Sequence, residues 1–440
     1  MTKLNELAAF VCGASAGSLP EAERATQKRH FIDTVVGAVA GLRCRETVEL
    51  KALFGNSLDE RMAHLAAAIR MTEIDDIHMP SCTTPSAVTV PVACAMALAE
   101  KASAATVADA IWVGTELLAR LGTAVDGPSI LYREVWPTYL AAPLAAAATA
   151  ARMLGLNEAK TVSALSVALT LTAGGSGRFR QDLSPRWFLH GMGVRSGYLA
   201  AKAADAGYVG DAGLLDRDWL QHSHGVALDL NRLFEGLGKG RSIYSELSMK
   251  PFSSAKQAVA AIEALRLIVA DGVAPESIRA VTVRVPKAYV GMIEGAGDSK
   301  NRATTFASVR FQMALALFHP NSLFDVARDK LPWDERMAAF VGKVKVEAAD
   351  ELAAHYPAHW PASVVVEAEG TSVTRTVIDA LGDPASPLSE AALTDKAHRV
   401  LDPMVGADAC KGWLDAAAAG WDKGSHDPKA ALLGELLRPV

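Results

Sequence analysis

The segment MTEIDDIHMPSCTTPS, residues 71–86, concentrates side chains that can transfer protons. Glu73, Asp75, Asp76 and His78 lie within six positions, and alanine-rich apolar sequence flanks the segment on both sides. Closely spaced carboxylates raise one another's pKa, so one of them can stay protonated and serve as an acid beside a histidine. The structural alternative is that the two aspartates cap a helix and bind loop amides.

Basic residues follow at three further places. Arg178 and Arg180 come after a glycine-rich run, where they would either bind an anion or lie in a solvated loop. Arg186 and His190 stand in SPRWFLHGMG, and a lone histidine in such a run is more often structural than catalytic. Lys250 opens the run KPFSSAK. Arginine can bind a carboxylate through two hydrogen bonds, but it cannot act as a base at neutral pH.

The chain that must position these residues has 440 residues, a length that predicts two domains. Apolar residues make up 50% of it and charged residues 21%, which is typical of a globular protein. The net charge of −5 and the lack of a long basic run argue against nucleic acid as a partner. An anionic substrate would therefore need local positive groups.

The N-terminus and the cysteines bear on the compartment. The first residues combine a short apolar patch with early acids, so we expect the first helix of the mature fold rather than a signal peptide. No stretch reaches about 18 uninterrupted apolar residues, so no membrane span is expected. The five cysteines are scattered and never form CxxC. They indicate reduced thiols in a cytoplasmic protein, not a disulfide framework or a zinc site.

The apolar periodicity divides the chain into a helical part and a mixed part. Helical spacing dominates to about residue 265, whereas IRAVTVRVP, KVKVEA and SVVVEAEGTSVTRTV read as strands, the last as a hairpin turning at Glu369-Gly370. A helical pattern, ATTFASVRFQMALALF, lies between the strands. We therefore expect a mostly α protein, with a large helical domain over 1–267 that 405–440 completes and a smaller α+β lid over 268–404.

Six segments resemble, in order, one family. They are FIDTVVGAVAG, TEIDDIHMPSCTTPSAVTVPVACAMALAE, YREVWPTYLAAPLAAAATAARMLGL, HGMGVRSGYLAAKAADAGYVG, SMKPFSSAKQAVAAIEAL and GDPASPLSEAALTDKAHRVL. All resemble the MmgE/PrpD family, and the likeness spans nearly the whole chain. It implies an all-helical domain with a smaller α+β lid, a homodimer, and no metal or organic cofactor. Members such as 2-methylcitrate dehydratase, cis-aconitate decarboxylase and iminodisuccinate epimerase make or break a bond beside a carboxylate of a small polycarboxylic acid.

The resemblance carries over to the acidic segment with one displacement. The family's motif resembles D-x-D-D-T followed shortly by H-P. Asp75 and Asp76 match the paired acids, and Glu73 takes the place of the leading acid. Thr84 stands where the family's histidine is expected, so His78 is a displaced histidine that would substitute for it.

Other family positions are altered or kept. Trp136 in EVWPTY occupies the place of a second histidine, and because tryptophan cannot shuttle a proton it would pack or shape the substrate wall. Arg186 aligns with a family lysine and keeps its positive charge, whereas Phe311, beside Arg310, replaces a lid tyrosine. Lys250 retains the family's K-P lysine and is the lysine most readily placed in the site.

The run after Lys250 also departs from the family. The expected cysteine and histidine are missing, and Ser254 and Lys256 stand nearby instead. A helix begins here, and its free amides would favour a carboxylate. With Arg180 and His190, these residues complete the candidate substrate contacts.

The resemblance implies a cofactor-independent lyase of the dehydratase or hydratase type, acting beside a carboxylate of a small di- or tricarboxylic acid. His78 would be the base or acid and Asp75 or Asp76 would orient it, while Lys250 and Arg186 hold substrate carboxylates. Two alternatives stay open: an epimerase or isomerase, and an inactive homologue that binds a polycarboxylate. A metal-dependent hydratase is less favoured, because no second cluster completes the ligands that D-D-x-H could supply.

Overall fold

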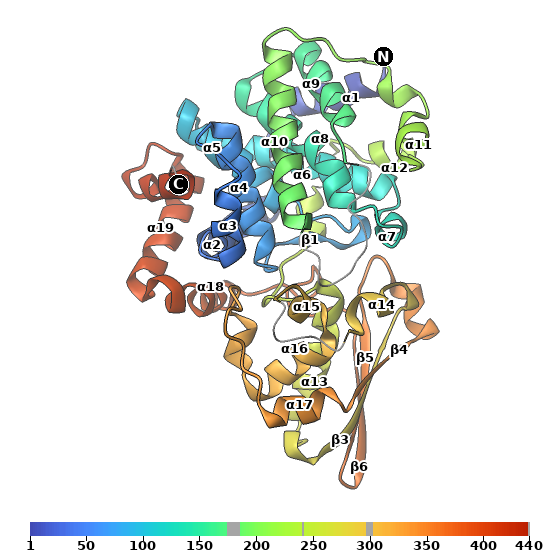
Figure 1. The fold of residues 1–440 in the computed structure, drawn as a ribbon. Coiled ribbons are helices and arrows are strands. Elements are labelled where there is room, and N and C mark those ends of the chain that lie inside the picture. The colour runs from blue at the N-terminus through green and yellow to red at the C-terminus, as the bar shows by residue number, and fades with distance from the viewer. Residues whose placement is uncertain (174–184, 240–241, 296–301, 439–440) are drawn as a thin grey trace.

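The computed structural model describes residues 1–173, 185–239, 242–295 and 302–438 and contains a large helical domain and a smaller α+β lid (Figure 1). The helices of the large domain are α1 (Lys3–Gly13), α2 (Glu21–Gly41), α3 (Arg45–Lys51), α4 (Leu58–Met71), α5 (Ser86–Glu100), α6 (Ala104–Ala124), α7 (Gly127–Leu131), α8 (Pro137–Leu154), α9 (Glu158–Thr170), α10 (Pro185–Asp205), α11 (Trp219–His224) and α12 (Leu230–Phe234). The fold class expected from the sequence is confirmed.

The core of the large domain forms around α8, which packs against α5, α6, α9 and α10. Many of its buried residues are alanines, so neighbouring helices can approach it closely along these positions. Gly191, the first glycine of LHGMG, likewise allows two helices to approach closely. A Cβ at Gly191 of α10 would lie 2.4 Å from the carbonyl oxygen of Ala63 in α4, so only glycine permits this contact.

The lid contains a four-stranded sheet in the order β4-β3-β5-β6. Its strands are β3 (Ile278–Val285), β4 (Val344–Ala348), β5 (Ala362–Ala368) and β6 (Thr371–Val377). β3 pairs in parallel with β4 and antiparallel with β5, and β5 and β6 form the hairpin predicted to turn at Glu369-Gly370. The lid helices are α13 (Lys256–Ala270), α14 (Val290–Ile293), α15 (Arg302–Ala307), α16 (Val309–Phe318) and α17 (Glu335–Val341).

Two details of the lid differ from expectation. The single helix predicted after residue 302 breaks into α15 and α16, because the Ser308 side chain accepts a hydrogen bond from the amide of Phe311 and starts a new helix. The boundary expected at 267 falls inside α13, which packs on β5, β6 and α16 and so belongs to the lid by its contacts. An amphipathic helix looks the same whichever domain it covers, so only the first strand at 278 signalled the change.

The C-terminal helices return to the large domain. α18 (Glu390–Val405) and α19 (Ala407–Lys423) pack on each other and on α2, and Figure 1 shows them beside α2 and α3. By packing, therefore, α18 also belongs to the helical domain, although residues up to 404 were expected in the lid. Among the described residues, no helix combines the length and apolar character needed to cross a membrane.

A buried arginine joins the lid to the helical domain. Arg302 of α15 donates to the carbonyl oxygens of Met71, at 2.9 Å, and Val326, and its guanidinium lies 4.9 Å from the ring centre of Phe306. Arg328 approaches the same ring at 4.0 Å. Phe306 is thus fixed at the domain junction between two cations.

Candidate active site

A pocket with an empty volume of about 580 Å³, part of it open solvent, lies between the two domains. We call it the junction pocket. It is lined by Arg70, Glu73, Ile77, Cys82, Thr84, Leu131, Trp136, Thr138 and Arg186 from the helical domain, by Lys250, Ala255, Lys256 and Gln257 from the connection into α13, and by Met292, Phe306, Ala307 and Trp360 from the lid.

The acidic segment enters the pocket through a left-handed residue. α4 ends at Met71, and Glu73 adopts φ 55°, a conformation uncommon for a residue other than glycine. The Glu73 carboxylate thereby reaches three cations, since its Oε2 lies 3.0 Å from Arg70 Nη1 and 3.2 Å from Lys250 Nζ, and its Oε1 lies 3.2 Å from Arg186 Nη2. Burial opposes ionisation of Glu73, but these cations outweigh it and hold the pKa of Glu73 well below its ordinary value.

Asp75 lies behind Lys250, so two carboxylates contact this lysine. Asp75 Oδ1 is 3.1 Å from Lys250 Nζ and 3.3 Å from Arg70 Nη1, and its Oδ2 has no hydrogen-bond partner among the described residues. Burial raises the pKa of Asp75, and Arg70 and Lys250 only partly offset this. Two neighbouring carboxylates are therefore pushed in opposite directions, and Asp75 is the one that takes up a proton more readily.

Asp76 has the structural role. One carboxylate oxygen accepts from the amide of Ser86, the first residue of α5, at 3.1 Å. The other is 2.9 Å from His30 Nδ1 and also accepts from the Ser86 hydroxyl. Asp76 thus caps α5 as the structural alternative proposed for the aspartates, and it does not line the junction pocket.

His78 does not line the junction pocket either, contrary to expectation. β1 (Ile77–His78) pairs with β2 (Leu247–Ser248), and neighbouring strand residues point to opposite faces. Ile77 therefore faces the junction pocket, while His78 lines another cavity, where its Nδ1 is 2.8 Å from Ser81 Oγ and its Nε2 is 3.2 Å from Glu246 Oε2. The structure separates this histidine from Lys250 and Arg186.

The first turns of α8 and α10 form one wall of the pocket. Arg186 of α10 lies over the rings of Trp136 and Trp187, at 5.9 and 5.0 Å from their centres, in addition to its contact with Glu73. Trp136 stacks on Tyr139 at 5.3 Å. Trp136 therefore serves as the aromatic support that fixes Arg186 at the pocket.

Two threonines supply neutral polar groups. Thr84 lines the pocket, and its hydroxyl is buried without a hydrogen-bond partner among the described residues. Its amide donates to the hydroxyl of Thr138, which also lines the pocket. The hydroxyl of Thr84 is thus available to a bound molecule at the position where a family histidine was expected.

Lys256 lines the pocket from the first turn of α13, and its Nζ lies 2.6 Å from Asp383 Oδ1. Ser254 does not line it, because its hydroxyl donates to the backbone carbonyl of Ala255. α8, α10 and α13 all begin at the pocket, where their N-terminal dipole ends add to the positive charge of the side chains. This arrangement favours an anionic ligand.

The other expected contacts lie elsewhere. His190 is buried, its Nε2 donates to the carbonyl of Ala87, and burial lowers its pKa to about 3, so its role is structural. Phe311 stacks on Trp333 inside the lid. Arg180, like Arg178, lies outside the described residues.

Sequence reasoning missed Arg70 and Asp383. Arg70 lies three residues before Glu73, a spacing at which side chains meet on a helix, and this was the available signal. Asp383 is more than 100 residues from its partner Lys256, so no local pattern connects the two.

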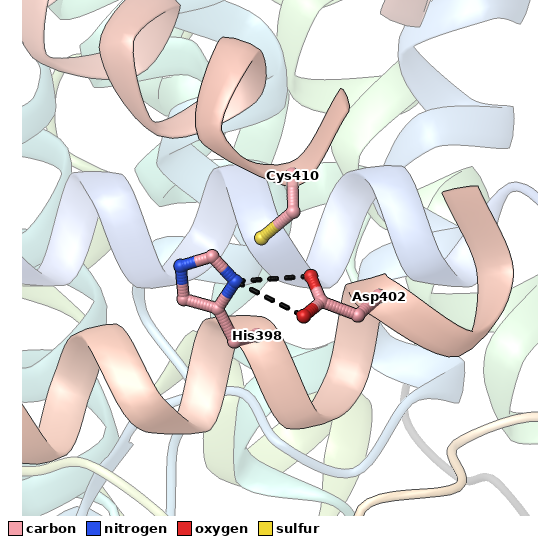
Figure 2. Close-up of side chains that lie close together, drawn as sticks. All are labelled: His398, Asp402 and Cys410. Atoms are coloured by element: carbon pink, nitrogen blue, oxygen red, sulfur yellow. Dashed lines mark hydrogen bonds and ion pairs between the residues drawn. The ribbon is translucent and has the colours of Figure 1, made fainter. Parts of the chain in front are cut away.

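Among the described residues, one group has the spacing of metal ligands: His398 and Asp402 of α18 with Cys410 of α19 (Figure 2). The imidazole Nδ1 lies 3.0 Å from Asp402 Oδ1, the ordinary pairing of residues four apart on a helix. Burial, and to a smaller extent Asp402, raises the pKa of the Cys410 thiol to about 12. The imidazole and the carboxylate are paired with each other, and this contact needs no ion to explain it, so we assign no metal to this group.

Comparison with known families agrees with the architecture. The MmgE/PrpD N-terminal domain matches residues 5–224, and the MmgE/PrpD C-terminal domain matches residues 252–419. Comparison with curated proteins gives no match. Since the two family domains follow one another over most of its length, the chain belongs to the MmgE/PrpD family, which is known for enzymes such as dehydratases.

Proposed function

We propose that the protein is a cofactor-independent lyase of the dehydratase or hydratase type that acts on a small di- or tricarboxylic acid. The observation that carries this proposal is the charge of the junction pocket. Among the described residues, its lining contains four cations, Arg70, Arg186, Lys250 and Lys256, and one carboxylate, Glu73. Even with Asp75 and Asp383 included, the cations outnumber the carboxylates, and an anionic substrate would balance the excess.

The donors in the junction pocket suit carboxylate groups of a substrate in particular. Arg186 is supported by two indole rings and contacts Glu73 through only one carboxylate oxygen, so its remaining N–H donors can bind a substrate carboxylate in the fork geometry that guanidinium provides. The amides at the start of α13 offer a second place for a carboxylate. Two such places suit a substrate with two or three carboxylates.

Lys250 is the proposed base. Its Nζ lies between Glu73 and Asp75, and Asp75 is the carboxyl whose pKa is raised. When Asp75 holds a proton, Lys250 can be a neutral amine and remove the proton beside a substrate carboxylate. The negative charge that develops on the substrate would then be stabilised by Arg70 and Arg186. His78, which lines another cavity, has no part in this scheme.

An epimerase is the second candidate, and one observation favours it. Among the described residues, no histidine lines the junction pocket, so the acid that would assist a leaving hydroxyl must be another group. A site that only removes and returns a proton needs no such acid. The epimerase would share Lys250 and the carboxylate contacts with the lyase.

Proton exchange measured by NMR in D2O distinguishes these candidates. Citrate, 2-methylcitrate, aconitate and aspartate-derived diacids would be incubated with the protein and followed over time. Exchange accompanied by loss or addition of water supports the lyase, whereas exchange without net reaction supports the epimerase. Thermal stabilisation by these acids without exchange or turnover would instead identify an inactive binding protein and overturn the proposed function.

The homodimer and the cytoplasmic location implied by the sequence stay predictions. Sedimentation equilibrium of the full chain tests the first, with a single species of twice the 46.3 kDa chain mass as the expected result. A concentration-independent monomer would contradict it.

A further inference from the structure

Asp383 is a buried carboxylate that follows the last strand of the lid, outside the segments that supply the residues of the junction pocket. Its Oδ1 accepts from the Ser248 hydroxyl at 2.5 Å and lies 2.6 Å from Lys256 Nζ, and its Oδ2 accepts from the amide of Ala380 at 2.8 Å. Asp383 is therefore fixed by neutral donors, and Lys256 is its one cationic partner in the described parts of the chain.

The turn that contains Asp383 lies very close to the backbone of Met249. Gly382 has φ +97°, and its amide and carbonyl bond to Ser386 and to the amide of Met249. A Cβ at Gly382 would lie 1.9 Å from the Met249 carbonyl oxygen, so no other residue fits without a backbone shift. The turn thus packs directly on the strand that leads into Lys250, which brings Asp383 to Lys256.

The two lysines of the junction pocket differ in how their N–H donors are used. Lys250 donates to both Glu73 and Asp75. Lys256 is as deeply buried, and beyond its ion pair with Asp383 its Nζ has no hydrogen-bond partner among the described residues. An ammonium has three N–H groups, so Lys256 keeps donors for a molecule in the pocket that it lines.

We propose that Lys256 is the acid that protonates the leaving hydroxyl and that Asp383 is the residue that positions it and keeps it charged. This inference rests on the proposed lyase function. It does not apply to the epimerase, because an epimerase has no leaving group. Asp383 also lines a separate cavity of about 680 Å³, so the pair lies between this cavity and the junction pocket.

The step balances as a β-elimination. Lys250, as a neutral amine, takes the proton beside the substrate carboxylate, and the electron pair of the broken C–H bond stays on the substrate as an enediolate, to which Lys250 can return a proton. In the next step this electron pair forms the carbon–carbon double bond. The C–O bond breaks with its electron pair on oxygen, and the hydroxyl takes a proton from the Lys256 ammonium and leaves as water. Lys250 then loses its extra proton to solvent, and Lys256 regains one.

The test compares two rates measured by NMR in D2O with citrate and 2-methylcitrate: exchange of the proton beside the carboxylate, and loss of water. In Lys256→Met we expect loss of water to fall about 100-fold or more while exchange stays within about 3-fold, because general acid catalysis typically contributes about 100- to 10,000-fold. In Asp383→Asn we expect a smaller fall in kcat with little change in KM. The high-pH limit of its activity should also move to lower pH, since a buried ammonium without its carboxylate loses its proton more easily.

Glu116→Gln is the matched control. Glu116 is also a buried carboxylate that binds one cation, Arg120, together with two neutral N–H donors, and neither residue lines the junction pocket. This variant should lose stability, as Asp383→Asn does, without changing the ratio of water loss to exchange or the pH profile. Equal falls of exchange and water loss in Lys256→Met, or no change in either, would overturn the inference alone. A wild-type protein that neither exchanges nor dehydrates any of the acids would overturn the proposed function together with it.

Discussion

The junction pocket and the cavity that His78 lines are on opposite faces of the β1–β2 pair, and they differ in how their charges are held. The junction pocket draws residues from both domains, and its lysines are buried against carboxylates. Among the described residues, those that line the His78 cavity, about 900 Å³, all belong to the helical domain and include Arg120, Arg232, Glu235, Lys239 and Glu246. Both contain titratable groups, but only the first is closed by the lid.

This difference shows why residue type alone is a poor guide to an acid/base site. A histidine titrates near neutral pH without help, whereas a lysine must be given a suitable environment by its neighbours. The buried carboxylates around Lys250 and Lys256 hold both lysines in place, and residues of the lid complete the wall of the junction pocket. The comparison therefore predicts that substitutions in the junction pocket lower kcat or raise KM, while substitutions in the His78 cavity leave both nearly unchanged.

The largest effect is expected for Lys250→Met. Removal of the proposed base should lower kcat about 1,000-fold, within the range that acid/base groups contribute. Lys250→Arg keeps the positive charge beside Glu73 and Asp75 but cannot accept a proton, so it should be about as inactive while unfolding at a higher temperature than Lys250→Met. Turnover by Lys250→Arg at the wild-type rate would exclude a proton-transfer role for this lysine.

A smaller effect, mainly on KM, is expected for Arg186→Gln. Loss of a hydrogen bond between charged groups costs about 1.5–3 kcal/mol, so KM should rise roughly 10- to 150-fold with less change in kcat. Arg195→Gln is the control, because Arg195 is on the same helix and pairs with Asp59 without lining the junction pocket. If both variants raise KM equally, the effect comes from α10 and not from a substrate contact.

The opposite pKa shifts of Glu73 and Asp75 predict opposite pH dependences of stability. Since the pKa of Glu73 is lowered by folding, its contribution is present above its unfolded pKa and is lost as pH falls toward its folded pKa. Since the pKa of Asp75 is raised, the folded state binds a proton more tightly, and its contribution falls as pH rises from the unfolded pKa through the folded one.

Urea unfolding of wild type, Glu73→Gln and Asp75→Asn between pH 4 and 8 measures these contributions. The stability of wild type relative to Glu73→Gln should rise with pH over the acid part of this range. Relative to Asp75→Asn it should fall, with a slope of at most about 1.4 kcal/mol per pH unit for one proton. Slopes of the same sign would show that the two carboxylates titrate as one unit with a shared shift.

Much of the fold could be predicted from the sequence, because periodicity reports which face of an element is buried. The alternation in IRAVTVRVP gave β3, and the β-branched run around Glu369-Gly370 gave the β5–β6 hairpin. The assignment of α13 and α18 to domains could not be predicted, since it depends on which partner covers an amphipathic face.

Less of the candidate site could be predicted. Five of the predicted site residues line the junction pocket: Thr84, Trp136, Arg186, Lys250 and Lys256. The spacing of Asp75, Asp76 and His78 predicted one cluster, but their side chains lie in three different places. Asp75 contacts Lys250, Asp76 caps the start of α5, and His78 lines a separate cavity. The direction of the His78 side chain depends on the pairing of β1 with β2. Since β1 is only two residues long, its alternation could not be recognised in the sequence.

The smallest effect on turnover is expected for His78→Ala, which separates the two regions most directly. Its imidazole bonds to Ser81 and Glu246 and does not line the junction pocket, so kcat and KM should stay within about 3-fold of wild type. The variant should nevertheless lose about 1–3 kcal/mol of unfolding free energy, because the buried imidazole no longer bonds to the buried Ser81 hydroxyl or to the half-buried Glu246. Urea unfolding and the exchange assay, run on the same preparation, measure both quantities. A folded His78→Ala variant that loses as much turnover as Lys250→Met would show that His78 takes part in catalysis. The substrate would then have to bind on the face of β1 that carries His78.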